Sequence, residues 1–188
     1  LYLCTRDSKH LEAAHKFDQP NLYKTVAKGG KNCLNGKHAN TTIPKFLGAL
    51  KRYVVLEQTG ELTKDDEAYL TNVEKFFDIA VTRHAYITGG VSVMEHFRKD
   101  NNQDGTRTQT NCESCCAHNM LKMAKELYKV TGDKKYADYY ETTLRNSIMG
   151  AVKSESGAAA YFIPMATGYF KTFGNEDPAV TGMVLAVL

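Results

Sequence analysis

Apolar residues recur every third or fourth position in two stretches of the first half of the chain, between 42 and 58 and between 69 and 80. This spacing is typical of helices that bury one face. Thr42 can cap the first helix, Pro44 is tolerated in its first turn, and Gly60 ends it. The apolar faces comprise Ile43, Phe46, Leu47, Leu50, Tyr53 and Val54, then Tyr69, Val73, Phe76, Phe77 and Ala80. The pattern predicts a helical hairpin.

Apolar residues have the same helical spacing in the second half of the chain, between 117 and 128 and between 136 and 148, with Thr131-Gly132-Asp133 as the turn. This predicts a second hairpin, whose turn resembles Thr59-Gly60-Glu61 of the first, so the chain carries a weak internal repeat. The predicted fold class is therefore mainly α. Repeated helical hairpins stack as a solenoid or close into a toroid, and the pattern alone does not separate the two.

The segments between these helices are irregular. Residues 1–17 are patterned as the end of a helix, and residues 20–36 read as a polar loop. A long polar loop from Arg98 to Thr110 has no apolar periodicity, and loops of this length inside a compact domain are usually functional. Residues 159–163 and 169–170 are predicted as short strands near the C-terminus.

Composition narrows the possible classes of protein. A chain of 188 residues that is 43% hydrophobic can form one domain or part of a larger one. The net charge of +3 is mild and no basic block is present, so we do not expect a nucleic-acid partner. No apolar run is long enough for a membrane span, so we expect a soluble chain. Because Leu1 already lies in a helical pattern, we expect the natural N-terminus upstream, and the compartment stays open.

Three of the five cysteines lie within Asn111–Cys116, which favours thiol or metal chemistry over a disulfide framework. Glu113 and Cys115 are two residues apart at the start of a predicted helix, where both side chains can turn toward one ion. A thiolate beside a carboxylate suits zinc, although this pair supplies only two of the usual four ligands. The alternative is a pair of buried free thiols packed as small hydrophobes.

Three further polar residues are candidates for chemistry. Glu95 lies between apolar neighbours just before the long loop, where a raised pKa would suit a general acid; the alternative is a solvated glutamate. His38 and Asn40 lie where a helix begins. They could hydrogen-bond the hydroxyls of a sugar substrate, or equally cap local backbone groups.

Six motifs follow one another along the chain: LNGKHANTTIPK at 34–45, YITGG at 86–90, EHF at 95–97, CESC at 112–115, KYADYYE at 135–141 and YFIP at 161–164. In type and order they resemble the β-L-arabinofuranosidase-type glycoside hydrolases of families 127 and 146. Several independent motifs in one order make the resemblance specific. It implies that residues 1–177 are a fragment of an (α/α)6 toroidal catalytic domain.

The resemblance also implies a reaction: retaining hydrolysis of non-reducing-end β-L-arabinofuranosides, with a plant glycan or glycoprotein as the carbohydrate partner. In the family, a glutamate and three cysteines hold zinc, and one of those cysteines is the nucleophile. By motif match, Glu113 and Cys115 would be zinc ligands and Glu95 the general acid/base.

The chain departs from the family near its end. The family places a Cys-Cys-x-Gly-Thr-Gly run shortly after the equivalent of 169–171, whereas residues 177–184 read DPAVTGMV. The nucleophile and one further ligand are thus missing from the sequence as written. If the gene is read in a shifted frame that begins at the third base of the Pro178 codon, it can encode Cys-Cys-x-Gly-x-Gly. We therefore hypothesise that residues 178–188 are an out-of-frame tail. A third base other than T in the Pro178 and Ala179 codons would exclude the shifted cysteine pair.

Two alternatives remain open at the level of sequence. One is a helical-repeat interaction module whose cysteines form a structural zinc or thiol site. The other is a carboxylate-only glycosidase of the same toroidal shape, in which Asp100 or Asp104 would face Glu95. In an enzyme, the loop from Arg98 to Thr110 should border a sugar-sized pocket that contains Glu95, whereas an interaction module would present a smooth concave face.

Overall fold

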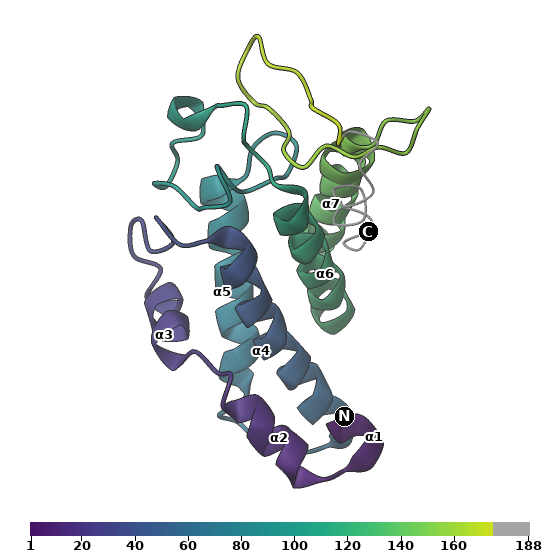
Figure 1. Cartoon of the computed structure of the whole chain (residues 1–188). Helices are drawn as coiled ribbons and strands as arrows, with labels where there is room; N and C mark the ends of the chain where they lie inside the picture. Colours follow the sequence, from purple (N-terminus) through teal and green to yellow (C-terminus); the bar gives the residue numbers. More distant parts are fainter. Residues whose placement is uncertain (175–188) are drawn as a thin grey trace.

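The computed structural model describes residues 1–174 and is built from helices and irregular loops (Figure 1). The mainly α prediction is confirmed. Within the described part of the chain the seven α-helices are α1 (Tyr2–Thr5), α2 (Ser8–His15), α3 (Pro20–Lys28), α4 (Ala39–Thr59), α5 (Glu67–His84), α6 (Ser114–Thr131) and α7 (Lys134–Thr143). The long loop between α5 and α6 contains one 3-10 turn, Asp104–Thr106, and α7 continues through a π-helical turn, Leu144–Ile148, into a 3-10 turn, Met149–Ala151. The predicted tail at 178–188 lies outside the described residues.

Both predicted hairpins are present, as α4 with α5 and α6 with α7. Helix α4 packs against both α5 and α6, so the two hairpins share one apolar core. Phe46 of α4 stacks on Phe76 of α5 with ring centroids 4.1 Å apart, and Phe77 of α5 meets Tyr136 of α7 edge-on at 4.9 Å. Aromatic pairs of this kind add to the burial of apolar surface. The periodic residues of the sequence are therefore the core.

The structure differs from the prediction at α3, which was predicted as a loop, and at the start of α4. Residues Pro20–Lys28 form α3 and not a loop, because Pro20 occupies a first-turn position and Tyr23 and Val26 are buried. Helix α4 begins three residues before Thr42, with His38 as its N-cap and no side-chain capping bond. The chain enters α4 directly from a short backbone pairing, which takes the place of a side-chain cap.

The two short strands predicted near the C-terminus are not formed. Residues 149–174 make only isolated bridges, between Val152 and Ala159 and between Ala160 and Phe173. Each bridge involves too few consecutive residues for a ladder, and Pro164 has no N–H to donate to one. No helix in residues 1–174 combines the length and apolarity needed to cross a bilayer.

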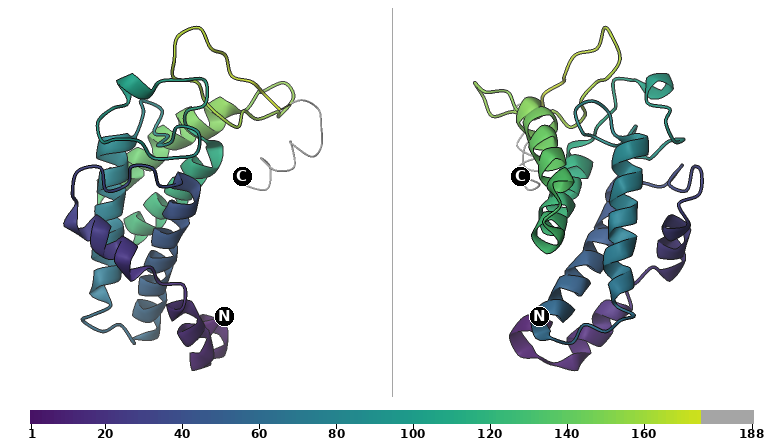
Figure 2. Two further views of the ribbon diagram at one scale, coloured as in Figure 1. Left: turned by 60° about the vertical axis from the view of Figure 1, so that its left-hand side comes forward. Right: turned by 180° about the vertical axis from the view of Figure 1, so that it is seen from behind.

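The connecting segments gather at one end of the helical hairpins. Figures 1 and 2 show the segments before α4, between α5 and α6, and after α7 at the same end of the molecule. Because hairpin helices alternate in direction, the N-terminal ends of α4 and α6 also lie there. Helix N-termini carry partial positive charge, so this end favours acidic groups. Glu95 and Glu113 both lie in these connecting segments.

Candidate active site

Backbone hydrogen bonds join the segment before α4 to the segment after α5. The N–H of Gly36 donates to the carbonyl of Phe97 at 2.9 Å, and the N–H of Phe97 donates to the carbonyl of Lys37 at 2.9 Å. The N–H of Ala39, the first residue of α4, donates to the carbonyl of Glu95 at 2.7 Å. The start of α4 is thus fixed against the residue predicted to be the general acid.

Similar bonds connect this segment to the start of α6 and onward to Tyr161. The N–H of Cys112 donates to the carbonyl of Ser92 at 2.8 Å. The N–H of Ser114 donates to the carbonyl of Tyr161 at 3.0 Å, which satisfies one of the free N–H groups at the start of α6. Three segments far apart in the sequence therefore meet, and they bring Glu95, Glu113 and Tyr161 together.

Glu95 lies in a tight two-residue turn between Val93 and His96. The N–H of His96 donates to the carbonyl of Val93 at 3.1 Å. Both central residues of the turn have positive φ, 46° at Met94 and 65° at Glu95. This combination is that of a type I′ turn, which Asn and Gly adopt far more readily than Met and Glu. Strained backbone of this kind clusters at functional sites, where it fixes the direction of a side chain.

Each carboxylate oxygen of Glu95 has its own partner. The hydroxyl of Tyr161 lies 2.7 Å from Oε1, and Nε2 of His38 lies 3.3 Å from Oε2. The side chain is 36% exposed, so it is held in place yet open to a ligand. The structure therefore brings His38 and Glu95 together at a partly exposed position.

Asn40, the other predicted substrate-binding residue, is tied to α6. Its Oδ1 accepts a hydrogen bond from Nδ2 of Asn119 at 2.8 Å. Its main-chain carbonyl lacks the usual helical donor four residues on, because Pro44 has no N–H. The pairing of Asn119 with Asn40 fixes the first turn of α4 against α6.

Glu113 is the N-cap residue of α6 and is 1% exposed. Oε1 accepts from the hydroxyl of Tyr161 at 2.8 Å, and Oε2 accepts from Sγ of Cys116 at 3.1 Å. Among residues 1–174, no lysine, arginine or histidine forms an ion pair with this carboxylate. A buried carboxylate is costly without a cation, so the position is chemically suited to a bound positive charge.

The thiols beside Glu113 are held in their protonated form. Burial, followed by the negative charge of Glu113, raises the pKa of Cys115 to about 11. Burial raises the pKa of Cys116 well above its usual value, and Glu113 adds to this effect. A divalent metal ion reverses this balance, because a coordinating thiol gives up its proton.

The described residues hold two of the predicted zinc ligands, Glu113 and Cys115, next to each other at the start of α6. No group of three or more His, Cys, Asp or Glu side chains within residues 1–174 is placed to hold a metal ion. Glu113 and Cys115, however, are the donor types that zinc prefers, and the buried carboxylate lacks a cationic partner. The donor types of this pair match two of the four ligands of a zinc site, and their role as ligands stays a prediction.

The YITGG segment packs closely against Cys112 and so fixes the path of the backbone that leads into Glu113. A Cβ atom at Gly90 would lie 2.4 Å from the Cβ of Cys112, so only glycine fits there. Cys112 itself has a φ of 53°, and its N–H bond to Ser92 leads the chain into Glu113. This explains why a glycine is needed at position 90.

Tyr161 and Cys116 are the residues that sequence reasoning did not place in the site. Tyr161 lies in the YFIP motif, so a signal existed, but the prediction for this segment was a short strand. Cys116 entered the sequence analysis only as one of three clustered cysteines. The partners of both are visible only once the loops are joined in space.

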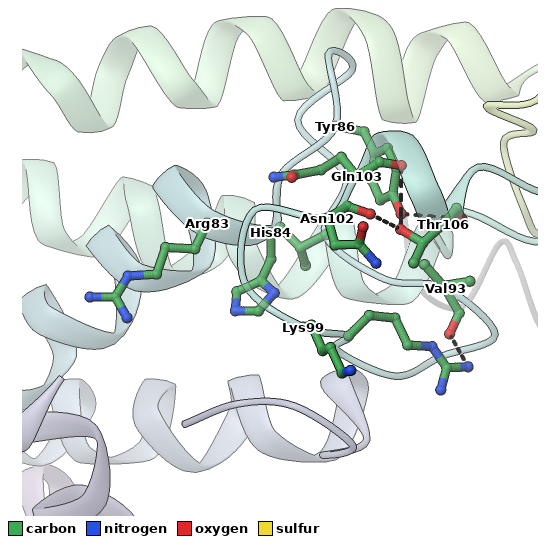
Figure 3. Close-up of a pocket in the computed structure, with 10 residues that line it drawn as sticks. Arg83, His84, Tyr86, Val93, Lys99, Asn102, Gln103 and Thr106 are labelled. Atoms are coloured by element: carbon green, nitrogen blue, oxygen red, sulfur yellow. Dashed lines mark hydrogen bonds between the residues drawn. The ribbon is translucent and has the colours of Figure 1, made fainter. Parts of the chain in front are cut away.

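The loop from Arg98 to Thr110 lines a small cavity together with the end of α5. The cavity beside it has a volume of about 10 Å³, room for roughly one water molecule, and Glu95 is not among its lining residues (Figure 3). Asp100 anchors the loop: Oδ2 accepts from Nη1 of Arg83 at 3.0 Å and from the N–H of Asn32 at 2.9 Å. The loop is thus a fixed support for the turn that carries Glu95.

Both candidates for the second acid of a carboxylate-only glycosidase have other partners in the structure. Asp100 is engaged with Arg83 and Asn32. Asp104 has a side chain that is 90% exposed and pairs with Arg107 at 2.7 Å. In the described residues neither forms a hydrogen bond with Glu95 or with Tyr161.

We expect Asp100→Ala to lower the free energy of unfolding by about 3 kcal/mol, because it leaves the partly buried Arg83 without its carboxylate. The matched control is Asp104→Ala in the same loop, which removes an exposed ion pair and should change stability by less than about 0.5 kcal/mol. Urea denaturation of the two variants and the parent measures both effects. Equal midpoints for Asp100→Ala and Asp104→Ala would contradict the anchoring role.

Comparison with known proteins agrees with these features. Residues 1–178 match the family model described as beta-L-arabinofuranosidase, GH127 catalytic domain. No curated protein matches the chain.

Solved structures share the fold. The GH127 beta-arabinofuranosidase BT3674 aligns with a TM-score of 0.70 at 23% identity over 98% of this chain. Ara127N-Se, a GH127 beta-L-arabinofuranosidase from Geobacillus stearothermophilus T6, aligns over 68% of this chain and 19% of its own with a TM-score of 0.55 at 21% identity. A protein described as a glycoside hydrolase aligns over 73% of this chain and 25% of its own with a TM-score of 0.56 at 18% identity.

The chain spans 30% of the length of BT3674, so it corresponds to part of that protein. The family match covers nearly the whole chain, and the motifs on which the sequence resemblance rested all fall inside it. The chain therefore belongs to the GH127 beta-L-arabinofuranosidase catalytic-domain family.

Proposed function

We propose that this chain is part of the catalytic domain of a retaining glycosidase that removes β-L-arabinofuranose from the non-reducing ends of plant glycans or glycoproteins. The observation that carries the proposal is the meeting of Glu95, Tyr161 and Glu113 from three separate segments. Family membership supplies the reaction class. In the whole protein, we expect the two hairpins described above to be part of an (α/α)6 toroid.

Glu95 is the proposed general acid/base. Its carboxyl group is positioned by a strained turn and by two side-chain partners, yet is 36% exposed and so can reach a bound sugar. As an acid it donates a proton to the glycosidic oxygen when the sugar leaves, and as a base it then takes a proton from water. The second half of the mechanism requires a nucleophile, for which the family uses a cysteine.

Glu113 and Cys115 are the proposed zinc ligands. Zinc, when bound, supplies positive charge that keeps cysteine thiols deprotonated. Glu113 contributes a buried carboxylate that has no cationic partner among residues 1–174, and Cys115 contributes a half-buried thiol beside it. Tyr161 and Cys116 orient the carboxylate by hydrogen bonds to its two oxygens.

His38 and Asn40 are proposed to contact the sugar. The side chain of His38 is 34% exposed next to Glu95, so its ring can meet both the acid and a hydroxyl group of the substrate. The carbonyl of Asn40, which lacks the usual helical donor because of Pro44, is a second acceptor at the same helix start.

Assays on an aryl β-L-arabinofuranoside test the proposal. We expect the whole catalytic domain to cleave this substrate and to leave the α-L anomer intact. We expect the 188-residue chain by itself to show little or no activity, because its sequence has no Cys-Cys-x-Gly-Thr-Gly run to supply a nucleophile. Cleavage of the substrate by this chain at the rate of a complete family member would refute that expectation.

A further inference from the structure

Tyr161 connects the two carboxylates of the candidate site. Its hydroxyl oxygen lies 2.7 Å from Oε1 of Glu95 and 2.8 Å from Oε1 of Glu113. The glutamates come from different segments, the turn after α5 and the start of α6. Within residues 1–174 they share no direct hydrogen bond, so the hydroxyl of Tyr161 is the atom that links them.

A phenolic hydroxyl has one proton, so it donates one hydrogen bond at a time. A bond donated to Glu113 is therefore unavailable to Glu95, and the reverse also holds. Whatever engages the carboxylate of Glu113 changes the hydrogen bond that Glu95 receives. The two glutamates thus share one donor.

Tyr161 is held firmly enough to act as such a link. Its carbonyl accepts the N–H of Ser114, the first residue of α6, at 3.0 Å. Its ring packs edge-on against Phe162 with centroids 4.7 Å apart. The backbone of Tyr161 and the N-cap residue Glu113 therefore belong to the same local unit, and the hydroxyl reaches from that unit to Glu95.

We propose that Tyr161 is a positioning residue that couples the acid/base carboxylate of Glu95 to the metal-binding carboxylate of Glu113. The inference rests on the proposed function, which assigns those roles to the two glutamates. With a cation bound, the carboxylate of Glu113 would compete less for the shared proton, and the hydroxyl of Tyr161 would donate to Glu95. The acid/base group is consequently oriented when the metal-binding side is filled.

Tyr161→Phe in the whole enzyme removes the hydroxyl and keeps the ring. We expect kcat on an aryl β-L-arabinofuranoside to fall about 10- to 100-fold with KM within about twofold, the size of effect expected for hydrogen bonds to charged groups. Tyr169→Phe is the matched control, since Tyr169 is 53% exposed, and it should leave both constants unchanged. A kcat for Tyr161→Phe equal to that of the control would overturn the proposal.

Zinc affinity tests the coupling without reference to activity. Chelator competition is measured for the parent, Glu95→Gln, Tyr161→Phe and the double variant. We expect Glu95→Gln to change zinc affinity at least about threefold when Tyr161 is present and not when it is phenylalanine, because residues in one hydrogen-bond network are non-additive. The same change in both backgrounds would overturn the coupling. Should Tyr161→Phe fail to fold, Glu95→Gln alone decides, and unchanged zinc affinity counts against the proposal.

Failure of the proposed function can be distinguished from failure of the coupling. If the whole protein binds no zinc and cleaves no arabinofuranoside, the proposed function is wrong. The hydrogen-bond link through Tyr161 is then tested by the urea denaturation midpoints of the metal-free parent, the two single variants and the double variant. Non-additive midpoints support a shared hydroxyl. Additive midpoints contradict it.

Discussion

Glu95→Gln is expected to lower kcat of the whole enzyme by about 10²- to 10⁴-fold, the range in which a positioned general acid/base contributes to rate. Glutamine keeps one oxygen that can accept from Tyr161 and places an NH2 group, which can donate to a neutral His38 ring, at the other position, so the turn and its neighbours should stay in place. The amide cannot donate a carboxyl proton to the leaving oxygen. Steady-state kinetics on an aryl β-L-arabinofuranoside measure the loss.

The control for this variant is Glu155→Gln, an exposed glutamate in the segment after α7. It should leave kcat unchanged. Substrates with activated leaving groups need less protonation, so the deficit of Glu95→Gln should shrink as the leaving group improves. A constant deficit across leaving groups would argue that Glu95 binds the sugar and does not act as the acid.

Glu113→Gln is expected to weaken zinc binding by about 100-fold or more, because loss of an outer partner alone costs 10- to 100-fold and Glu113 is proposed as a ligand. Without metal, the free energy of unfolding of this variant should not be lower than that of the parent. The substitution removes a buried charge that has no cationic partner among residues 1–174, which offsets the altered hydrogen bonds to Tyr161 and Cys116. Chelator competition and urea denaturation measure the two effects.

Glu126→Gln on the same helix is the matched control. Glu126 pairs with Lys51 at 3.0 Å, away from the cysteines. Its substitution should leave zinc affinity within about twofold of the parent. A loss of metal-free stability in Glu113→Gln, with no change in zinc affinity, would mean that Glu113 is a structural helix cap only.

Periodicity predicted the long helices well and the short ones poorly. Phe46 and Phe76 belong to helices with several buried turns, so the helical spacing of apolar residues is clear in the sequence. Helix α3 buries only Tyr23 and Val26, too few for a periodic signal. Pro20 and Gly29 looked like loop residues, but they occupy the first helical position and the left-handed C-cap, where each is favoured.

The candidate site was predictable in its residue types and not in its connections. Glu95 and Glu113 stand out because a carboxylate among apolar residues or cysteines is chemically unusual. Tyr161 does not stand out, because many tyrosines in this chain occupy helical core positions. Its role depends on hydrogen bonds between loops 48 residues apart in sequence, and local pattern carries no information about such pairing.

The metal content of the whole protein tests the central claim most directly. Elemental analysis of the purified parent should find about one zinc per chain, the content of a single four-ligand site. Cys115→Ser and Glu113→Gln should each contain much less. Zinc content that is unchanged in both variants would contradict the assignment of Glu113 and Cys115 as ligands, and with it the account of this site.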